Sequence, residues 1–359
     1  MDYQKTLFHI FEKAIKDKNV SDIHLMAGYK PFFRINGELF PLSEEETIDA
    51  QMTQKFAFLL MSEEQKEKFL KEKDIDFSFN FKENIRFRIN IFFQRGNISL
   101  ALRLIQNKIR TIKELNLPSI LHRFTQCQQG FVLITGASSQ GKSTTLAALI
   151  DEINHTRKEH IITIEDPIEY IFVPDKSIIE QREVHADTIS FRRALRATLR
   201  EDPNVIMVGE LRDLESISTA LTAAETGHLV FATLHTNSAD QTIHRIVDVF
   251  PAVHQNQIRS QLAGSLFGIV AQRLVPSLGG GFLPACEVMF NNSAISNLIR
   301  ENKIHEIPAI IETSAQAGMI PLNKSLAELV KTKKISKETA INYSLNPRDL
   351  ISRLMTENI

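Results

Sequence analysis

The chain has 359 residues, 43% of them hydrophobic and 24% charged, a composition typical of a globular protein with more than one hydrophobic core. Its formal net charge of −1 gives no overall electrostatic footprint for nucleic acid. The two cysteines, Cys127 and Cys286, form no CxxC pair, which argues against a disulfide framework or a structural zinc site and favours a reducing compartment. We expect no secretory leader and no membrane span, because the longest apolar run, 262–275, is short and interrupted by polar residues.

The first 105 residues predict a small α+β domain. Apolar residues recur at helical spacing near the start, and a second helical run follows further along. Alternating apolar and polar residues indicate half-buried strands, and Asn36-Gly37 between apolar flanks predicts a hairpin turn. The helical runs are 4–18 and 50–73, and the clearest strand runs are 85–93 and 98–105. Weak periodicity over 106–118 predicts a linker.

The pattern changes after the linker, and 119–359 predicts an α/β domain. Short apolar runs without alternation are typical of strands buried on both faces of a mostly parallel sheet. Helical patterns separate most of these runs, which are 131–135, 161–164, 205–208 and 229–234. From about 291 to 359 the pattern is helical, so we expect a helical region at the C-terminal end.

A glycine-rich loop carries the strongest functional signal. Residues 136–143 fit the phosphate-loop pattern GxxxxGK[ST], with a buried strand before them and a helical pattern after them. Backbone N–H groups of such a loop point at phosphate oxygens, Lys142 is predicted to reach the β- and γ-phosphates, and Ser143 to hold Mg²⁺. The alternative, a glycine turn without a ligand, does not account for these flanks. The predicted binding residues are Gly136, Ser138, Ser139, Gln140, Gly141, Lys142, Ser143 and Thr144.

Carboxylates follow two of the other buried runs. Glu210 comes at the end of one strand, at the sheet edge where Mg²⁺ or the attacking water would lie, and is predicted to help hold the metal. The segment 165–169 ends another strand, and a carboxylate there suits activation of water. The alternatives are a surface ion pair for Glu210 and a solvated helix cap for the segment.

Histidines and arginines complete the candidate set. His228 and His235 flank the run 229–234, and His235 is a candidate to sense the γ-phosphate, although single histidines are more often core residues. Arg88 and Arg103 lie on late strands of the first domain, where arginines either reach a neighbouring subunit's nucleotide or stay on the exposed surface. A solvated basic face or a contact between subunits also explains the helically spaced Arg192, Arg193, Arg196 and Arg200.

These motifs together resemble the secretion-ATPase superfamily, and within it the type IV pilus retraction ATPases of the PilT and PilU kind. The similarity covers nearly the whole chain. Its specific parts are the loop segment GASSQGKSTTLAALI, the Asp box IEDPIEY, the segment QREVHADTISF, the Walker B stretch LREDPNVIMVGELRD and the His box TAAETGHLVFATLHTNSADQTIHRIVDVFP.

The resemblance implies a PAS-like N-terminal domain joined to a RecA-like P-loop ATPase domain, with ATP and Mg²⁺ between the subunits of a homohexameric ring. By position it implies Glu169 as the water-activating carboxylate and Glu210 as the Walker B glutamate. His228 and His235 become the His-box pair. Arg88 and Arg103 correspond to first-domain arginines of the family, either of which is a candidate to act in a neighbour's site.

The same resemblance implies where the protein acts and with what. It implies a cytoplasmic motor, peripheral at the inner face of the bacterial cytoplasmic membrane. Its partners would be an inner-membrane pilus platform protein, indirectly pilin, and a paralogous pilus ATPase, with no nucleic acid. The predicted function is therefore an ATP-hydrolysing motor for type IV pilus retraction and twitching motility, driven by rotation between its two domains.

Three departures from the family pattern stand out. Ser139 occupies a loop position where the family usually has glycine, and Ser296 replaces the arginine of a C-terminal motif linked to retraction. The QRG of FFQRG is shifted by one residue, as in the PilU kind. We see neither the longer N-terminal region nor the four-cysteine insertion of assembly-type relatives, which favours retraction. The alternatives are an assembly or secretion ATPase of the same superfamily, or a nucleotide-gated accessory module with little turnover.

Overall fold

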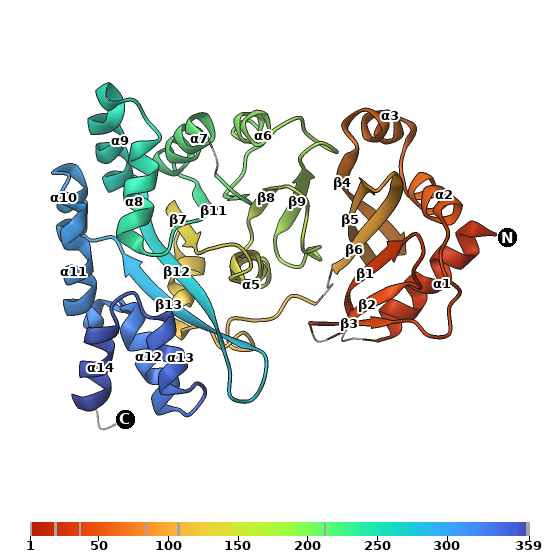
Figure 1. Cartoon of the computed structure of the whole chain (residues 1–359). Coiled ribbons are helices and arrows are strands. Elements are labelled where there is room, and N and C mark those ends of the chain that lie inside the picture. Colours follow the sequence, from red (N-terminus) through yellow and green to blue (C-terminus); the bar gives the residue numbers. More distant parts are fainter. Residues whose placement is uncertain are drawn as a thin grey trace. The chain divides into compact units, whose positions relative to one another are not determined.

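The structure is a computed structural model that describes residues 2–17, 20–35, 37–82, 85–105, 108–211 and 213–356. The chain divides into two compact units, which are described separately (Figure 1). The first comprises Met1–Lys108 and Pro167–Ile171, and the second comprises Ile109–Asp166 and Phe172–Ile359. In the part of the chain described here, no helix is long and apolar enough to cross a membrane.

An antiparallel sheet with three helices forms the first unit. Its strand order is β3-β2-β1-β6-β5-β4. The strands are β1 (Val20–Met26), β2 (Phe32–Ile35), β3 (Glu38–Pro41), β4 (Asp74–Lys82), β5 (Ile85–Gln94) and β6 (Asn97–Ile105). The helices are α1 (Tyr3–Lys16), α2 (Ala50–Leu60) and α3 (Glu63–Glu72). The predicted Asn36-Gly37 turn lies partly outside the described residues, but β2 and β3 on either side of it pair antiparallel.

Local side chains decide where the helices of this unit begin. Asp2 accepts a hydrogen bond from the backbone N–H of Lys5 and so caps α1, whose apolar face packs into the core. The range 50–73, predicted to be helical, contains two helices, α2 and α3. Ser62 forms a capping box with Gln65 and so begins α3. Helix α2 ends at Leu60, two residues earlier.

A seven-stranded sheet forms the centre of the second unit. Its order is β13-β12-β7-β11-β10-β8-β9, and every neighbouring pair is parallel except β12 with β13. The strands are β7 (Gly130–Thr135), β8 (His160–Glu165), β9 (Ile178–Glu183), β10 (Val205–Val208), β11 (Leu229–Leu234), β12 (Leu266–Pro276) and β13 (Phe282–Phe290). All residues of β7, β10 and β11 are buried, which explains why these strands read as unbroken apolar runs. The prediction of an α/β fold is confirmed.

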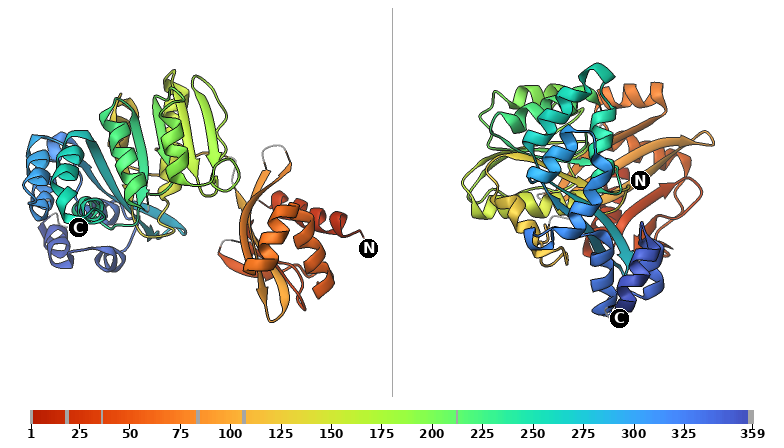
Figure 2. Two further views of the ribbon diagram at one scale, coloured as in Figure 1. Left: turned by 90° about the horizontal axis from the view of Figure 1, so that it is seen from above. Right: turned by 90° about the vertical axis from the view of Figure 1, so that its left-hand side faces the viewer.

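Helices connect and flank these strands. They are α4 (His122–Gln126), α5 (Lys142–Thr156), α6 (Phe191–Thr198), α7 (Leu214–Glu225), α8 (Ala239–Asp248), α9 (Ala252–Ser265), α10 (Ser293–Arg300), α11 (Ile307–Thr313), α12 (Leu322–Lys331), α13 (Lys337–Tyr343) and α14 (Pro347–Thr356). The last three, in dark blue in Figures 1 and 2, gather beside β12 and β13. Their apolar side chains share a separate core with Val275 and Ala285 of those strands.

Gly268 of β12 tests how tightly this sheet is packed. A Cβ atom at this position would lie 2.5 Å from the carbonyl oxygen of Met289 and 2.8 Å from Cε1 of Phe124. We expect Gly268→Ala to lower the free energy of unfolding by about 2 kcal/mol or more, because both neighbours are fixed by packing. Gly264, on the exposed side of α9, has no atom within 4 Å of a built Cβ. Gly264→Ala should therefore raise stability by about 1 kcal/mol.

Denaturant unfolding of the two variants, side by side with the unchanged chain, measures both effects. Equal stability changes of one sign would show that the close contacts around Gly268 do not limit the packing.

Candidate active site

The glycine-rich loop connects β7 to α5 at the carboxyl edge of the parallel sheet. Gly136, Ser139 and Gly141 have φ values of 149°, 61° and 78°, so the chain turns through the left-handed region three times within six residues. Helix α5 begins at Lys142, directly after Gly141. The first N–H groups of a helix have no acceptor within the helix, and together with the helix dipole they favour an anion. The loop therefore offers the backbone donors that a phosphate group needs.

Lys142 places an ammonium group over this loop. Its side chain is 8% exposed, and Nζ donates hydrogen bonds of 2.9 Å to the carbonyl oxygens of Gly136 and Ala137. The same nitrogen lies 3.4 Å from Nδ1 of His235. A cation held by neutral carbonyls gains a stronger, charge-assisted bond when a phosphate oxygen is within reach.

His235 connects Lys142 to Glu210. Its Nε2 lies 3.1 Å from Oε1 of Glu210, while Nδ1 faces the lysine ammonium. Because Lys142 can only donate, Nδ1 must accept, and the ring proton is assigned to Nε2, which donates to the carboxylate. The side chains of His235 and Glu210 are 42% and 21% exposed, so the line is accessible from outside. The structure thus brings together the loop, Lys142, His235 and Glu210.

Their meeting point follows from strand register. Glu210 comes two residues after β10 and His235 directly after β11, and these strands are parallel neighbours with Val208 opposite Ala232. Strand β11 in turn pairs with β7, with Leu234 opposite Thr135, which is the residue before the loop. Carboxyl ends of parallel strands share one edge of a sheet, so the three segments converge there.

Glu165 ends β8 at the same edge. It is 7% exposed, and its Oε1 accepts hydrogen bonds from Thr163 Oγ1 at 2.7 Å and from Gln181 Nε2 at 3.2 Å. Glu169, by contrast, lies in the segment Pro167–Ile171, which belongs to the first unit. Its role as the water-activating carboxylate stays a prediction.

The structure does not bring His228 to this edge. It directly precedes β11, at the amino end of the strand, and its Nδ1 lies 2.9 Å from the carbonyl oxygen of Ala223. The six residues of β11 lie between it and His235, which corresponds to a distance of about 20 Å. Within one chain, His228 therefore lies at the end of β11 opposite the loop, and its catalytic role stays a prediction.

Both candidate arginines of the first unit have carboxylate partners. Arg88 on β5 pairs with Asp76 of β4 at 2.6 Å, and Arg103 on β6 pairs with Asp22 of β1 at 2.9 Å. The side chains of Arg88 and Arg103 are 37% and 67% exposed. The Arg88–Asp76 pair is exposed on both sides and contributes about 1 kcal/mol or less, so a competing anion can displace the carboxylate, whereas Asp22 of the Arg103 pair is buried.

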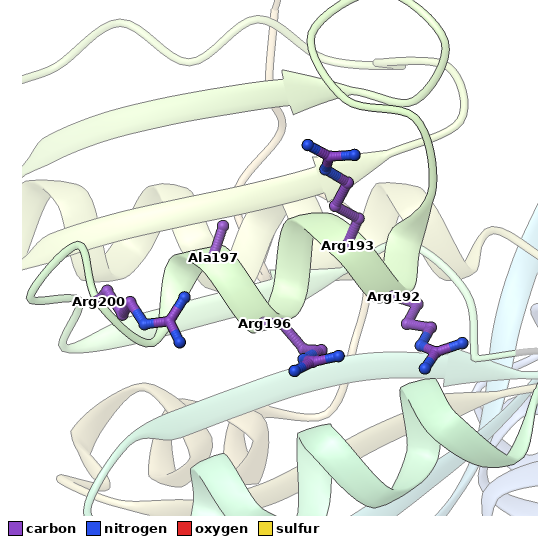
Figure 3. A pocket seen from close by; sticks show the side chains of 5 residues that line it. All are labelled: Arg192, Arg193, Arg196, Ala197 and Arg200. Atoms are coloured by element: carbon purple, nitrogen blue, oxygen red, sulfur yellow. The ribbon is translucent and has the colours of Figure 1, made fainter.

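The helically spaced arginines, Arg192, Arg193, Arg196 and Arg200, lie along α6 and just beyond it (Figure 3). Together with Ala197 they line a shallow pocket, and Figure 3 shows Arg193 pointing away from Arg192 and Arg196. Arg192 forms an ion pair with Glu215 at the start of α7. The pocket contains four guanidinium groups, which agrees with either of the two predicted interpretations, a solvated face or a contact between subunits.

Glu287 of β13 fixes the helix that follows His235. Its Oε1 accepts a 2.8 Å hydrogen bond from the backbone N–H of Ala239, the first residue of α8. Burial is the main cause that raises the pKa of Glu287 to about 7; the Ala239 hydrogen bond opposes this rise and the neighbouring Asp240 adds to it. The edge strand β13 thereby sets the direction in which the chain leaves the His235 segment. Sequence reasoning missed this residue because no local motif surrounds it.

The comparisons with known proteins cover nearly the whole chain. A family model described as Type II/IV secretion system protein matches residues 3–346. The "Type IV pilus retractation ATPase PilT" of Pseudomonas aeruginosa is 44% identical over 90% of this chain and 94% of its own. The "Type IV pilus ATPase PilU" of the same organism is 38% identical over 96% of this chain and 91% of its own. A crystal structure of the pilus retraction motor PilT with bound ADP is 47% identical, has a TM-score of 0.89, and covers 96% of this chain and 98% of its own.

The α/β fold, the phosphate loop beside the Lys142–His235–Glu210 line and these similarities define a P-loop ATPase. More closely, the chain belongs to the Type II/IV secretion system protein family. The prediction of an ATPase with the fold of this family is confirmed.

The backbone at Ser139 lies in the left-handed region, which accounts for the glycine expected at this loop position but not for the serine found there. A side chain in the left-handed region costs about 1–2 kcal/mol, whereas glycine adopts it freely. We expect Ser139→Gly to raise the free energy of unfolding by about 1 kcal/mol. Ser138→Gly is the matched control, since Ser138 has no positive φ, and it should lower stability by about 0.5–1 kcal/mol. Thermal unfolding of both variants tests this, and a loss in Ser139→Gly would contradict it.

Proposed function

We propose that this chain is the subunit of a homohexameric, Mg²⁺-dependent ATPase that powers retraction of a type IV pilus. The observation that carries the proposal is the line Lys142–His235–Glu210 beside the phosphate loop, because it connects the phosphate site to a strand-end carboxylate. The similarity to proteins named as pilus retraction ATPases supports the mechanical role. Hydrolysis would change the angle between the proposed domains, 1–105 and 119–359, through the linker 106–118.

The donor set at the loop fits a magnesium–nucleotide complex. Ser143 offers a hydroxyl in the first turn of α5, and Glu210 offers a carboxylate at the same sheet edge, which are oxygen ligands of the kind Mg²⁺ prefers. The bound metal supplies positive charge that neutralises the phosphate oxygens. Lys142 and the backbone N–H groups of 136–144 bind and orient the phosphates.

His235 and Glu169 would each contribute to the proposed chemistry. When a phosphate oxygen takes over the Lys142 ammonium, Nδ1 of His235 loses its donor, and the ring reports that change to Glu210 through Nε2. The carboxylate of Glu169 would accept a proton from the attacking water.

Arg88 and Arg103 would complete the site of a neighbouring subunit. A guanidinium supplied by another chain stabilises the charge of the transferred phosphoryl group. Asp76 and Asp22 hold the two arginines until that anion competes for them. His228, about 20 Å from the loop of its own chain, would likewise act only through a neighbour or as a support of its strand.

The proposal extends to place and partners. A motor of this kind would work in the cytoplasm, peripherally at the inner face of the bacterial cytoplasmic membrane. It would act on an inner-membrane platform protein and, through it, on pilin, and no nucleic acid is involved.

An accessory pilus ATPase is the second candidate, and two observations favour it. A relative that matches 96% of this chain is named as PilU. In addition, Ser296 replaces the arginine that the family resemblance links to retraction. The Ser296 side chain is buried and donates to the carbonyl oxygen of Ala263 at 2.9 Å, with Asn291 Oδ1 at 3.1 Å. It therefore packs α10 against α9 and offers no charge to a partner.

A deletion strain separates these candidates. Loss of a retraction motor should leave excess surface pili and abolish twitching, whereas loss of an assembly ATPase should remove the pili. Complementation with Glu210→Gln should fail to restore twitching, although the variant still binds ATP, because turnover should fall at least 100-fold. Pilus counts, twitching zones and purified ATPase rates are the measurements. Normal twitching in the deletion strain would exclude the motor role and favour the accessory module.

Mixed rings test the residues assigned to a neighbour. Arg88→Ala and Lys142→Ala should each abolish turnover alone, but a mixture should regain activity, since one interface type then contains both an intact loop and an intact arginine. A mixture of Glu210→Gln and Lys142→Ala is the matched control. It should stay inactive, because each residue serves the site of its own subunit and every site in the mixed ring then carries one of the two changes. No recovery in the first mixture would argue against a role for Arg88 in trans. Glu169→Ala should bind ATP normally and lose most turnover.

A further inference from the structure

Gln272 is a buried amide in the middle of β12, the strand that pairs with β7 on the side away from β11. It is 3% exposed, and the functional assignments above make no use of it. Its Oε1 accepts a 2.7 Å hydrogen bond from Oγ1 of Thr145 in the first turn of α5. Its Nε2 donates a 2.7 Å hydrogen bond to the carbonyl oxygen of Gln140 in the phosphate loop. One side chain therefore ties the loop to the helix that follows it.

Gln140 is held by β12 a second time. Its side-chain Oε1 accepts a 2.6 Å hydrogen bond from the backbone N–H of Leu274, two residues after Gln272. Both the main chain and the side chain of Gln140 are thus bound to the same strand. A loop residue held at two points has little freedom to rotate its peptide groups.

The bond to the Gln140 carbonyl has a direct geometric consequence. The carbonyl of residue 140 and the N–H of Gly141 belong to one planar, trans peptide group, so they point in opposite directions. Fixing the carbonyl toward Gln272 fixes the Gly141 N–H on the other side. That N–H is one of the loop donors that a phosphate oxygen would use.

The two glycines at the ends of the loop show how close β12 approaches. A Cβ atom at Gly136 would lie 2.4 Å from the carbonyl oxygen of Gln272, and one at Gly141 would lie 3.0 Å from its Nε2. The phosphate loop therefore touches Gln272 at both ends. The contact of Gly136 with a backbone oxygen requires glycine for a reason that is independent of any ligand.

We propose that Gln272 is a positioning residue for ATP hydrolysis, which orients the Gly141 N–H of the phosphate loop through its hydrogen bond to the Gln140 carbonyl. It touches no substrate atom and acts through the peptide group between residues 140 and 141. The proposal rests on the ATPase activity and not on the direction of pilus movement.

Two nearly isosteric variants separate positioning from packing. Gln272→Met removes both hydrogen bonds, whereas Thr145→Val removes only the bond to α5 and keeps the bond to the loop. In the full-length protein, we expect Gln272→Met to weaken the binding of a fluorescent ADP analogue about tenfold and to lower kcat for ATP. Thr145→Val should change the affinity for the ADP analogue no more than about twofold, even if its midpoint of thermal unfolding falls as far as that of Gln272→Met.

The comparison of the two variants decides the outcome. Equal losses of ADP affinity at equal losses of stability would overturn the proposal, because packing against α5 would then explain both. Unchanged affinity in Gln272→Met would also overturn it. If Gln272→Met does not fold, Gln272→Leu removes the same two hydrogen bonds with a shorter side chain and should also weaken ADP binding about tenfold; wild-type affinity there would contradict the proposal. ADP binding to the purified protein is measured without pili, so a failure of the motor role would not affect this test.

Discussion

The parallel pairing of β7 with β11 on one side and with β12 on the other is the constraint on which the site depends. Pairing with β11 brings His235 to the loop, and the further pairing of β11 with β10 adds Glu210. Pairing with β12 brings Gln272 to the other side of the loop. A shift of either register by one residue would turn these side chains to the opposite face of the sheet. The full burial of β7 and β11 opposes such a shift.

The chemistry at this edge depends on a small number of directed hydrogen bonds. Lys142 can only donate and a carboxylate can only accept, so the imidazole of His235 between them must take one tautomer. When the Lys142 ammonium moves away from Nδ1, the hydrogen bond from Nε2 to Glu210 can change with it. Charge and geometry at the loop are thus coupled over two contacts.

Some of this arrangement could be predicted from the sequence because its signals are local. The strand, loop and helix around Lys142 follow one another directly, and Glu210 and His235 each come just after a buried strand. The meeting of these residues then follows from a general rule of parallel sheets. The same rule puts His228, which precedes its strand, at the opposite edge.

Other features could not be predicted because their partners are remote or conformational. Gln272 is one polar residue in an apolar run, and its two partners lie 127 and 132 residues away in the chain. The left-handed backbone of Ser139 is a property of the folded loop, and the residue type gives no sign of it. The break between α2 and α3 depends on a capping box at Ser62 that a helical periodicity alone hides. The proposed relation of Arg88 and Arg103 to a neighbour's loop depends on an assembly that one chain does not contain.

The two hydrogen bonds from β12 to Gln140 have a kinetic consequence. A loop that a neighbouring strand already holds in shape has little conformational entropy left to lose when nucleotide binds. Its affinity for phosphate is then limited less by ordering of the loop than by the contacts themselves. Association should be fast, because no slow rearrangement of the loop must come first. Such a site can exchange ADP for ATP repeatedly without rebuilding its own backbone in each cycle.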